Sequence, residues 1–111
     1  MSTNDEQQFP RIAEREMDAL KRALIKAEAD ADFEVEEQGG VLHVLFDDPP
    51  GKFVITTNSP VRQIWISALS TSYKLALQEE HFVLPKTGET LTKLVARLIN
   101  EHMGEAVVEL E

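Results

Sequence analysis

The stretch from Lys52 to Leu69 reads KFVITTNSPVRQIWISAL and decides the fold. It holds two runs rich in β-branched and aromatic residues, Phe53 to Thr57 and Ile64 to Ile66, on either side of Asn58-Ser59-Pro60. Asn tolerates left-handed backbone geometry and Pro has a fixed φ, so this tripeptide is typical of a tight turn. The stretch therefore predicts a strand, a turn and a second strand.

The second of these strands places the only Trp of the chain outside the core. Side chains alternate between the two faces of a strand, so Ile64 and Ile66 share one face while Gln63 and Trp65 share the other. We expect the apolar row to face the core. Because exposed aromatic side chains are enriched at protein interfaces, Trp65 indicates a contact surface for another protein. The alternative is a ring that lies flat over its neighbours as a lid.

The segment before this hairpin predicts a helix and then strands. Apolar residues at three- and four-residue spacing predict a helix over residues 9–29, with Pro10 in its first turn and a start between Gln7 and Phe9. Phe33 and Val35 alternate with acidic residues, so Asp32 to Glu37 reads as the first strand.

The segment after the hairpin predicts further strands and a second helix. Thr87 is the expected N-cap of that helix, and Gly104 its expected end. Apolar residues of the C-terminal tail are expected to pack back onto the body: Val107, Val108 and Leu110. The predicted fold class is α+β, a two-layer sandwich. It has an antiparallel sheet of about six strands, with the N- and C-terminal helices packed on one face.

Composition narrows the class of protein. The chain has 111 residues, which predicts a single domain over residues 1–111. Its net charge of −9 argues against nucleic acid and anionic membranes as partners, because phosphate repels such a surface. There is no Cys, and the polar, acidic start is unlike a secretory signal. We therefore expect a cytoplasmic protein.

An acidic run without any basic residue joins the first helix to the first strand. Its members are Glu28, Asp30, Asp32, Glu34, Glu36 and Glu37. Carboxylate clusters of this kind bind hard cations weakly, with water completing the coordination shell. The alternative is a solvated edge strand whose charges prevent aggregation. The three His residues, His43, His81 and His102, lack metal-ligand spacing, and no catalytic motif is recognisable, so we expect no enzyme.

Three stretches together resemble the frataxin family, in particular its bacterial branch, the CyaY proteins. They are FPRIAE (9–14) with GGVL (39–42), SPVRQIWIS (59–67), and TGETL (87–91) with GEAVV (104–108). The second resembles the family's P-x-x-Q-[IV]-W signature, and the match runs along nearly the whole chain. The resemblance implies the frataxin fold, which agrees with the α+β sandwich read from the residues.

The resemblance also implies a function. Frataxins bind iron (Fe²⁺/Fe³⁺) weakly on an acidic ridge and dock on a cysteine desulfurase and its scaffold complex during iron–sulfur cluster assembly, as iron donor or regulator. By position, the ridge residues here are Glu14, Glu28, Asp30, Asp32, Glu34 and Glu36. The implied partner-binding residues are Gln63, Trp65 and Asn58. We expect a monomer. The alternative is a protein-binding module with the frataxin fold that has lost iron binding.

The chain departs from the bacterial pattern at several positions. Where that pattern has acids on the second half of the first helix, this chain has Lys21, Arg22, Ile25 and Lys26. Where it has a His near the start of that helix, an Asn in the third strand and a Trp in the sixth, this chain has Pro10, Thr56 and Phe82. The predicted ridge is therefore interrupted by positive charge, whereas Gln63 and Trp65 keep the sheet-face signature.

Overall fold

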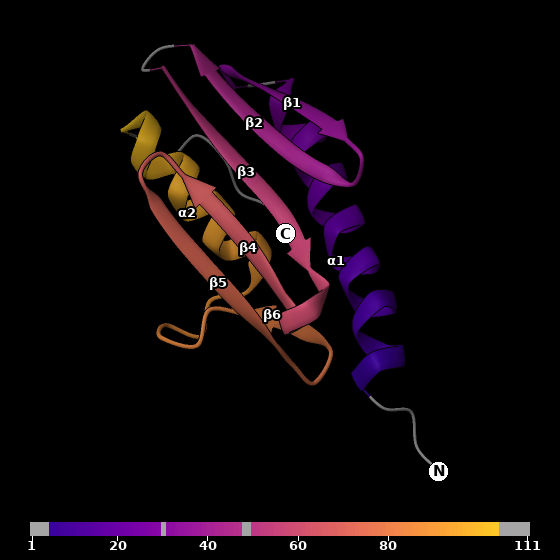
Figure 1. Cartoon of the computed structure of the whole chain (residues 1–111). Coiled ribbons are helices and arrows are strands. Elements are labelled where there is room, and N and C mark those ends of the chain that lie inside the picture. Colours follow the sequence, from indigo (N-terminus) through magenta and orange to yellow (C-terminus); the bar gives the residue numbers. More distant parts are fainter. Residues whose placement is uncertain (1–4, 30, 48–49, 105–111) are drawn as a thin grey trace.

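The computed structural model describes residues 5–29, 31–47 and 50–104, with side chains from Gln8 onward (Figure 1). Its elements, in chain order, are α1 (Asp5–Glu28), β1 (Phe33–Gln38), β2 (Val41–Asp47), β3 (Pro50–Asn58), η1 (Ser59–Val61), β4 (Gln63–Ala68), β5 (Thr71–Gln78), β6 (His81–Val83) and α2 (Leu91–Met103).

The strands form one six-stranded sheet whose order, β1-β2-β3-β4-β5-β6, repeats the order of the chain. Every neighbouring pair is antiparallel. The turn between β1 and β2 contains Gly39 and Gly40, whose φ angles are 59° and 85°. Glycine adopts such angles without a steric penalty, which explains why this pair closes the hairpin. The predicted antiparallel sheet is confirmed.

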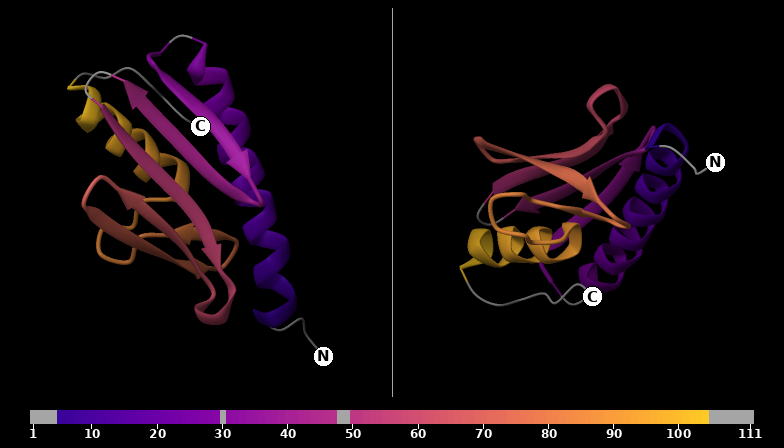
Figure 2. Two further views of the ribbon diagram at one scale, coloured as in Figure 1. Left: turned by 45° about the horizontal axis from the view of Figure 1, so that its top comes forward. Right: turned by 90° about the horizontal axis from the view of Figure 1, so that it is seen from below.

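Both helices pack on the same face of the sheet, and the two views of Figure 2 show this layering. The core between the layers is built from apolar side chains of every strand and both helices. From α1 it includes Ile12, Leu20 and Leu24, from the central strands Phe53, Ile55, Ile64 and Ile66, and from α2 Leu94, Val95 and Ile99. Burial of these side chains is the main force that holds the helices on the sheet. The predicted two-layer sandwich is confirmed, and we call the other side of the sheet the open face.

The start of α1 differs from the prediction. The helix begins at Asp5, so Pro10 lies inside it rather than in its first turn. Pro10 has no N–H to donate to the carbonyl four residues earlier, which normally disfavours this position. Packing compensates, because Phe9 is 3% exposed and its ring meets that of Phe82 edge-on, with centroids 5.6 Å apart. The helix therefore starts earlier than local propensity indicates, and the contact of Phe9 with Phe82 holds its first turns against β6.

The start of α2 also differs. The helix begins at Leu91 and its N-cap is Thr90, not Thr87. Thr87 instead belongs to the preceding loop, where its Oγ1 donates to Glu89 Oε1 at 2.8 Å and accepts from the Glu89 N–H at 3.2 Å. Thr87 therefore lies three residues before the N-cap, and its hydroxyl forms hydrogen bonds within the loop instead.

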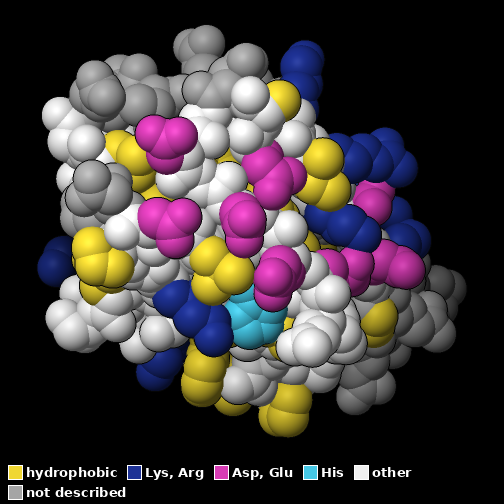
Figure 3. Space-filling model, turned by 90° about the horizontal axis from the view of Figure 1, so that it is seen from above, with side chains coloured by type: hydrophobic (Ala, Val, Ile, Leu, Met, Phe, Trp, Pro, Cys, Tyr) yellow, Lys and Arg dark blue, Asp and Glu magenta, His cyan; other side chains and the backbone are white. Residues whose placement is uncertain are grey.

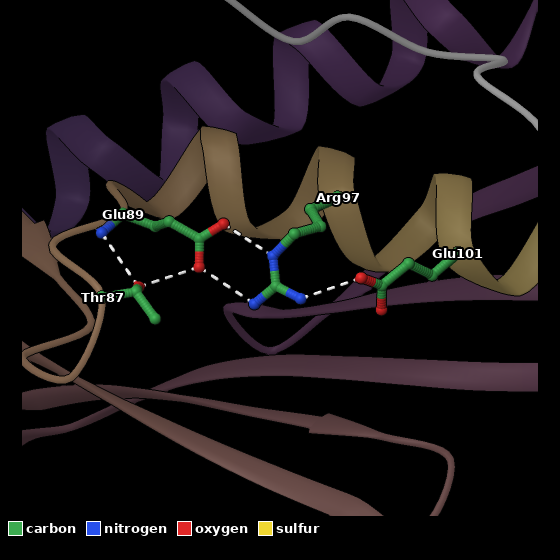
Figure 4. Close-up of polar contacts among 4 residues, drawn as sticks. All are labelled: Thr87, Glu89, Arg97 and Glu101. Carbon is green, nitrogen blue, oxygen red and sulfur yellow. Dashed lines mark hydrogen bonds and ion pairs between the residues drawn. The ribbon is translucent and has the colours of Figure 1, made fainter.

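A network of charged groups ties this loop to α2 (Figure 4). Glu89 receives two hydrogen bonds from Arg97, from Nε at 2.6 Å and from Nη2 at 2.9 Å. Arg97 Nη1 donates to Glu101 Oε2 at 2.9 Å. The hydrogen bonds from Arg97 lower the pKa of the Glu89 carboxyl below its ordinary value, and Glu89 in turn raises the pKa of Arg97. Such bidentate pairs fix geometry as well as charge.

The last turn of α2 packs against β2 and β3 through His102. The imidazole centroid lies 4.4 Å from the ring of Phe46 and 6.0 Å from that of Phe53. Gly51 provides the room for this contact. A Cβ at Gly51 would lie 2.8 Å from His102 Cε1 and 2.9 Å from Leu69 Cδ2, closer than real Cβ atoms approach. Gly51 is therefore favoured by close packing, because a larger residue would have to displace the side chains of His102 and Leu69.

Candidate functional site

A row of side chains crosses the middle of the open face. The strand register pairs Thr56 of β3 with Trp65 of β4, and Trp65 with Lys74 of β5. Ile64 and Ile66, on either side of Trp65, are almost completely buried, whereas Trp65 is half-buried. The alternation predicted from the sequence therefore holds, and the indole lies on the face that the helices leave uncovered.

Two neighbours hold the Trp65 ring in place. Its Nε1–H donates to Gln63 Oε1 at 2.7 Å, between residues on the same side of β4. The ammonium Nζ of Lys74 lies over the ring, 4.9 Å from its centroid, within the range of a cation–π contact. Because the indole donor is bonded to Gln63 and Lys74 lies over the ring, a partner would meet apolar ring surface beside an ammonium group.

A hollow of about 370 Å³ lies beside the ring. Its walls come from β3, β4 and β5: Val54, Thr56, Trp65, Ile66, Ser67, Ser72, Tyr73 and Lys74. Apolar walls with a few hydroxyl groups and one ammonium are typical of a recognition pocket. Asn58, the third predicted partner-binding residue, is opposite Gln63 at the end of β3. The structure thus brings the three predicted partner-binding residues to one part of the open face.

The predicted iron ligands are spread over two regions. Asp32 is exposed just before β1, and Glu34 and Glu36 are exposed along it, alternating with the inward-facing Phe33 and Val35. They therefore lie on the open-face side of the edge strand. At the end of the molecule that is uppermost in Figure 1, acidic side chains gather with Lys and Arg among and beside them (Figure 3).

Glu14 lies elsewhere, on α1. It lines a separate hollow of about 390 Å³ between α1 and the strands, together with Asp18, Lys21 and Glu37 but with none of Asp32, Glu34 and Glu36. Asp30 lies outside the described residues. The structure therefore places Glu34 and Glu36 on β1 and Asp32 just before it, and it sets Glu14 apart from them.

The basic residues of α1 are bonded to nearby acids. Lys21 Nζ lies 2.6 Å from Glu37 Oε1, and Arg22 Nη2 lies 2.8 Å from Asp18 Oδ2. Within residues 5–29, 31–47 and 50–104, no three His, Asp or Glu side chains are grouped so that they could hold a metal ion. The ligand role of the ridge residues stays a prediction. The Asp18–Arg22 pair follows from i,i+4 spacing, but no local pattern reveals the pair between Lys21 and Glu37, sixteen residues apart.

Glu28 has a partner that the sequence does not reveal. Its Oε2 accepts a hydrogen bond from the backbone N–H of Val35 at 3.0 Å. The last residue of α1 is therefore bonded to the middle of β1, whereas the resemblance assigns it to the ridge as an iron ligand.

Neither helix in the described part of the chain combines the length and the apolar character that crossing a membrane requires.

Comparison with known proteins identifies the fold and the family. The chain is similar to frataxin from Psychromonas ingrahamii, with 16% identity and a TM-score of 0.79 over 96% of this chain and 97% of that one. It is similar to yeast frataxin, with 24% identity and a TM-score of 0.68 over 88% and 82%. It is also similar to a trimeric frataxin from Saccharomyces cerevisiae complexed with ferrous iron, with 22% identity and a TM-score of 0.61 over 95% and 91%.

At these identities the structural likenesses show a shared fold. Membership is shown by the sequence pattern of the family described as Frataxin-like domain, which matches residues 2–105. The chain therefore belongs to the frataxin-like family.

Proposed function

We propose that this protein acts in iron–sulfur cluster assembly by docking through its open face onto a cysteine desulfurase and its scaffold complex, as iron donor or regulator. The observation that carries the proposal is the Trp65 ring, held by Gln63 and Lys74 on the uncovered face of a frataxin fold. Family membership supports the same role. We assign the protein no catalysis of its own and place it in the cytoplasm as a monomer.

The chemistry of the open face suggests what a partner must offer. The apolar ring and the hollow beside it fit an apolar side chain, because a rigid aromatic surface desolvated in a pocket anchors many interfaces. Lys74 lies over the ring and Lys52 is exposed at the start of the same sheet region, so an acidic group on the partner would find positive charge there.

We further propose that iron binds weakly to the carboxylates of the ridge, with Asp32, Glu34 and Glu36 as its centre. These side chains are exposed, and hard cations take carboxylate oxygens with water in the remaining positions. The relative solved with ferrous iron supports a place for iron on this fold. Here iron is the cargo of the protein rather than a resident cofactor.

A second function is favoured by a specific observation. The Lys21–Glu37 and Arg22–Asp18 ion pairs neutralise one acid of β1 and one acid of α1 within the protein itself. If the remaining carboxylates are too few for iron, the protein is a docking module that has kept the fold and lost the metal.

An anaerobic titration of the purified protein with Fe²⁺ separates the two functions. The iron-binding function predicts measurable binding that is weakened when Asp32, Glu34 and Glu36 are changed together to their amides. Changing Glu79, Glu80 and Glu101 together to Gln removes the same charge away from β1 and is the matched control. Absence of binding at millimolar Fe²⁺ would leave the docking module as the function.

Docking is tested with Trp65→Ala and a purified cysteine desulfurase–scaffold complex. We expect the variant to lose about 2 kcal/mol or more of binding free energy, as is typical for a buried aromatic anchor. Because Trp65 is only half-buried, its folding should suffer less than the about 3–5 kcal/mol that truncating a core Trp costs. A large loss of stability with unchanged affinity would show that the ring is structural.

A further inference from the structure

The Val35 N–H belongs to β1, the strand at one edge of the sheet. Among the described residues, β1 is the outermost strand of the sheet and pairs only with β2. In an antiparallel strand, alternate residues direct their N–H groups to the partner and away from it. The Val35 N–H donates to Glu28, a residue outside the sheet, so we infer that Val35 presents its N–H away from β2. An unpaired N–H at an edge strand is a place where another strand can add.

Glu28 closes this edge from the helix layer. It is the last residue of α1, and β1, which begins at Phe33, runs in the opposite direction to the helix (Figure 1). Its Oε2 lies 3.0 Å from the Val35 nitrogen in a partly buried contact. A carboxylate that accepts from a backbone N–H forms one of the stronger hydrogen bonds in proteins. The bond therefore links the end of α1 to the middle of the strand that carries Glu34 and Glu36.

We propose that Glu28 is a positioning residue, not an iron ligand: its carboxylate caps the Val35 N–H, closes the edge of β1 and sets the strand relative to α1. The part of this proposal that concerns iron rests on the cation site proposed above for the ridge. The proposal removes Glu28 from the predicted iron ligands. It also makes the positions of Glu34 and Glu36 depend on a hydrogen bond from a residue that does not bind the iron.

Amide hydrogen exchange at Val35, followed by NMR, tests the cap directly. Glu28→Gln keeps a carbonyl oxygen of the same reach and should leave Val35 exchange within about threefold of the parent protein, since a neutral acceptor still satisfies the N–H. Glu28→Ala removes the acceptor and should speed exchange at Val35 about tenfold or more. Glu34→Gln is the control, because it removes a charge from β1 without touching the bond. Unchanged Val35 exchange in Glu28→Ala would overturn the cap.

Fe²⁺ titration of the same variants, at an ionic strength near 0.15 M, tests the ligand assignment. Glu28→Gln should change Fe²⁺ affinity by less than about threefold, because only a screened neighbouring charge is lost. Glu36→Gln, which removes a proposed ligand, should weaken binding several-fold more. Equal weakening by both would overturn the positioning role. If the parent protein binds no Fe²⁺, the iron part of the proposed function fails, and Val35 exchange alone decides the role of Glu28.

Discussion

Gln63 should affect docking indirectly by holding the Trp65 ring, because its amide oxygen accepts a hydrogen bond from the indole N–H at 2.7 Å. Gln63→Ala should leave the ring free to move and weaken docking by about 1 kcal/mol, less than Trp65→Ala. Gln63→Glu keeps an oxygen acceptor for the indole N–H, so the ring should stay in place and any loss of binding should come from the added negative charge. A double-mutant cycle measured by calorimetry is the check. In the Trp65→Ala background, Gln63→Ala should have almost no further effect, and fully additive losses would show that Gln63 contacts the partner independently.

Gly51 is a residue at which a single added methyl group should lower stability. Gly51→Ala places a methyl group 2.8 Å from His102 Cε1 and 2.9 Å from Leu69 Cδ2. The imidazole rests on Phe46 and has little freedom to retreat, so we expect the free energy of unfolding to fall by about 1–3 kcal/mol. Urea denaturation measures the loss. The loss from Gly51→Ala should be smaller when His102 is already Ala, and an equal loss in both backgrounds would contradict the proposed clash.

Among the elements, α1 carries the clearest departure from an acidic ridge. Changing Lys21, Arg22 and Lys26 together to Glu adds negative charge, and it releases Glu37 and Asp18 from their ion pairs. We expect tighter binding of divalent cations. Stability should fall, because exposed pairs worth about 1 kcal/mol or less each are replaced by repulsion in a protein of net charge −9. Isothermal titration with Mn²⁺ and thermal denaturation measure the two effects. An unchanged affinity would mean that α1 is not part of the cation site.

The loop between β6 and α2 should make stability depend on pH. The pKa of Glu89 is lowered in the folded protein, chiefly by the hydrogen bonds from Arg97. The stabilisation is therefore present above the ordinary pKa of a glutamate and is lost as the pH falls through the lowered value. Glu89→Gln should cost about 1 kcal/mol near neutral pH, and the difference from the parent should shrink below about pH 4. Urea denaturation at both pH values is the measurement, and a difference that does not change with pH would contradict the assignment.

These elements also show how far sequence reasoning reaches. The strands could be predicted because alternation is local: Ile64 and Ile66 point inward, and that alone sends Trp65 outward. The start of α1 was predicted too late, because Pro10 is typical of a first turn, whereas the helix begins at Asp5 and packs Phe9 against Phe82. The N-cap of α2 was predicted at the wrong residue, because Thr87 fits the cap pattern but its hydroxyl is hydrogen-bonded to Glu89. In the candidate site, the open-face residues followed from periodicity, whereas the bonds of Lys21 and Glu28 depend on distances between elements.

For the molecule as a whole, the two candidate surfaces are separate. The carboxylates lie along β1 at one edge of the sheet, while Trp65 and Lys74 lie on β4 and β5. Residues farther apart than about 10 Å with no shared partner usually act independently. A mutation on one of these surfaces should therefore change iron binding without changing docking, or docking without changing iron binding.

The sheet that follows the order of the chain also has a consequence for how the protein folds. Each strand finds its partner in the next segment of the sequence, so pairing closes only short loops and costs little chain entropy. The long-range events are those in which α1 meets β6 and α2, near the other end of the chain. We infer that the hairpins assemble early and that the docking of α1 limits the rate. Pairing between neighbouring segments favours fast formation of the sheet, and isomerisation at the five prolines is then the expected source of slow phases.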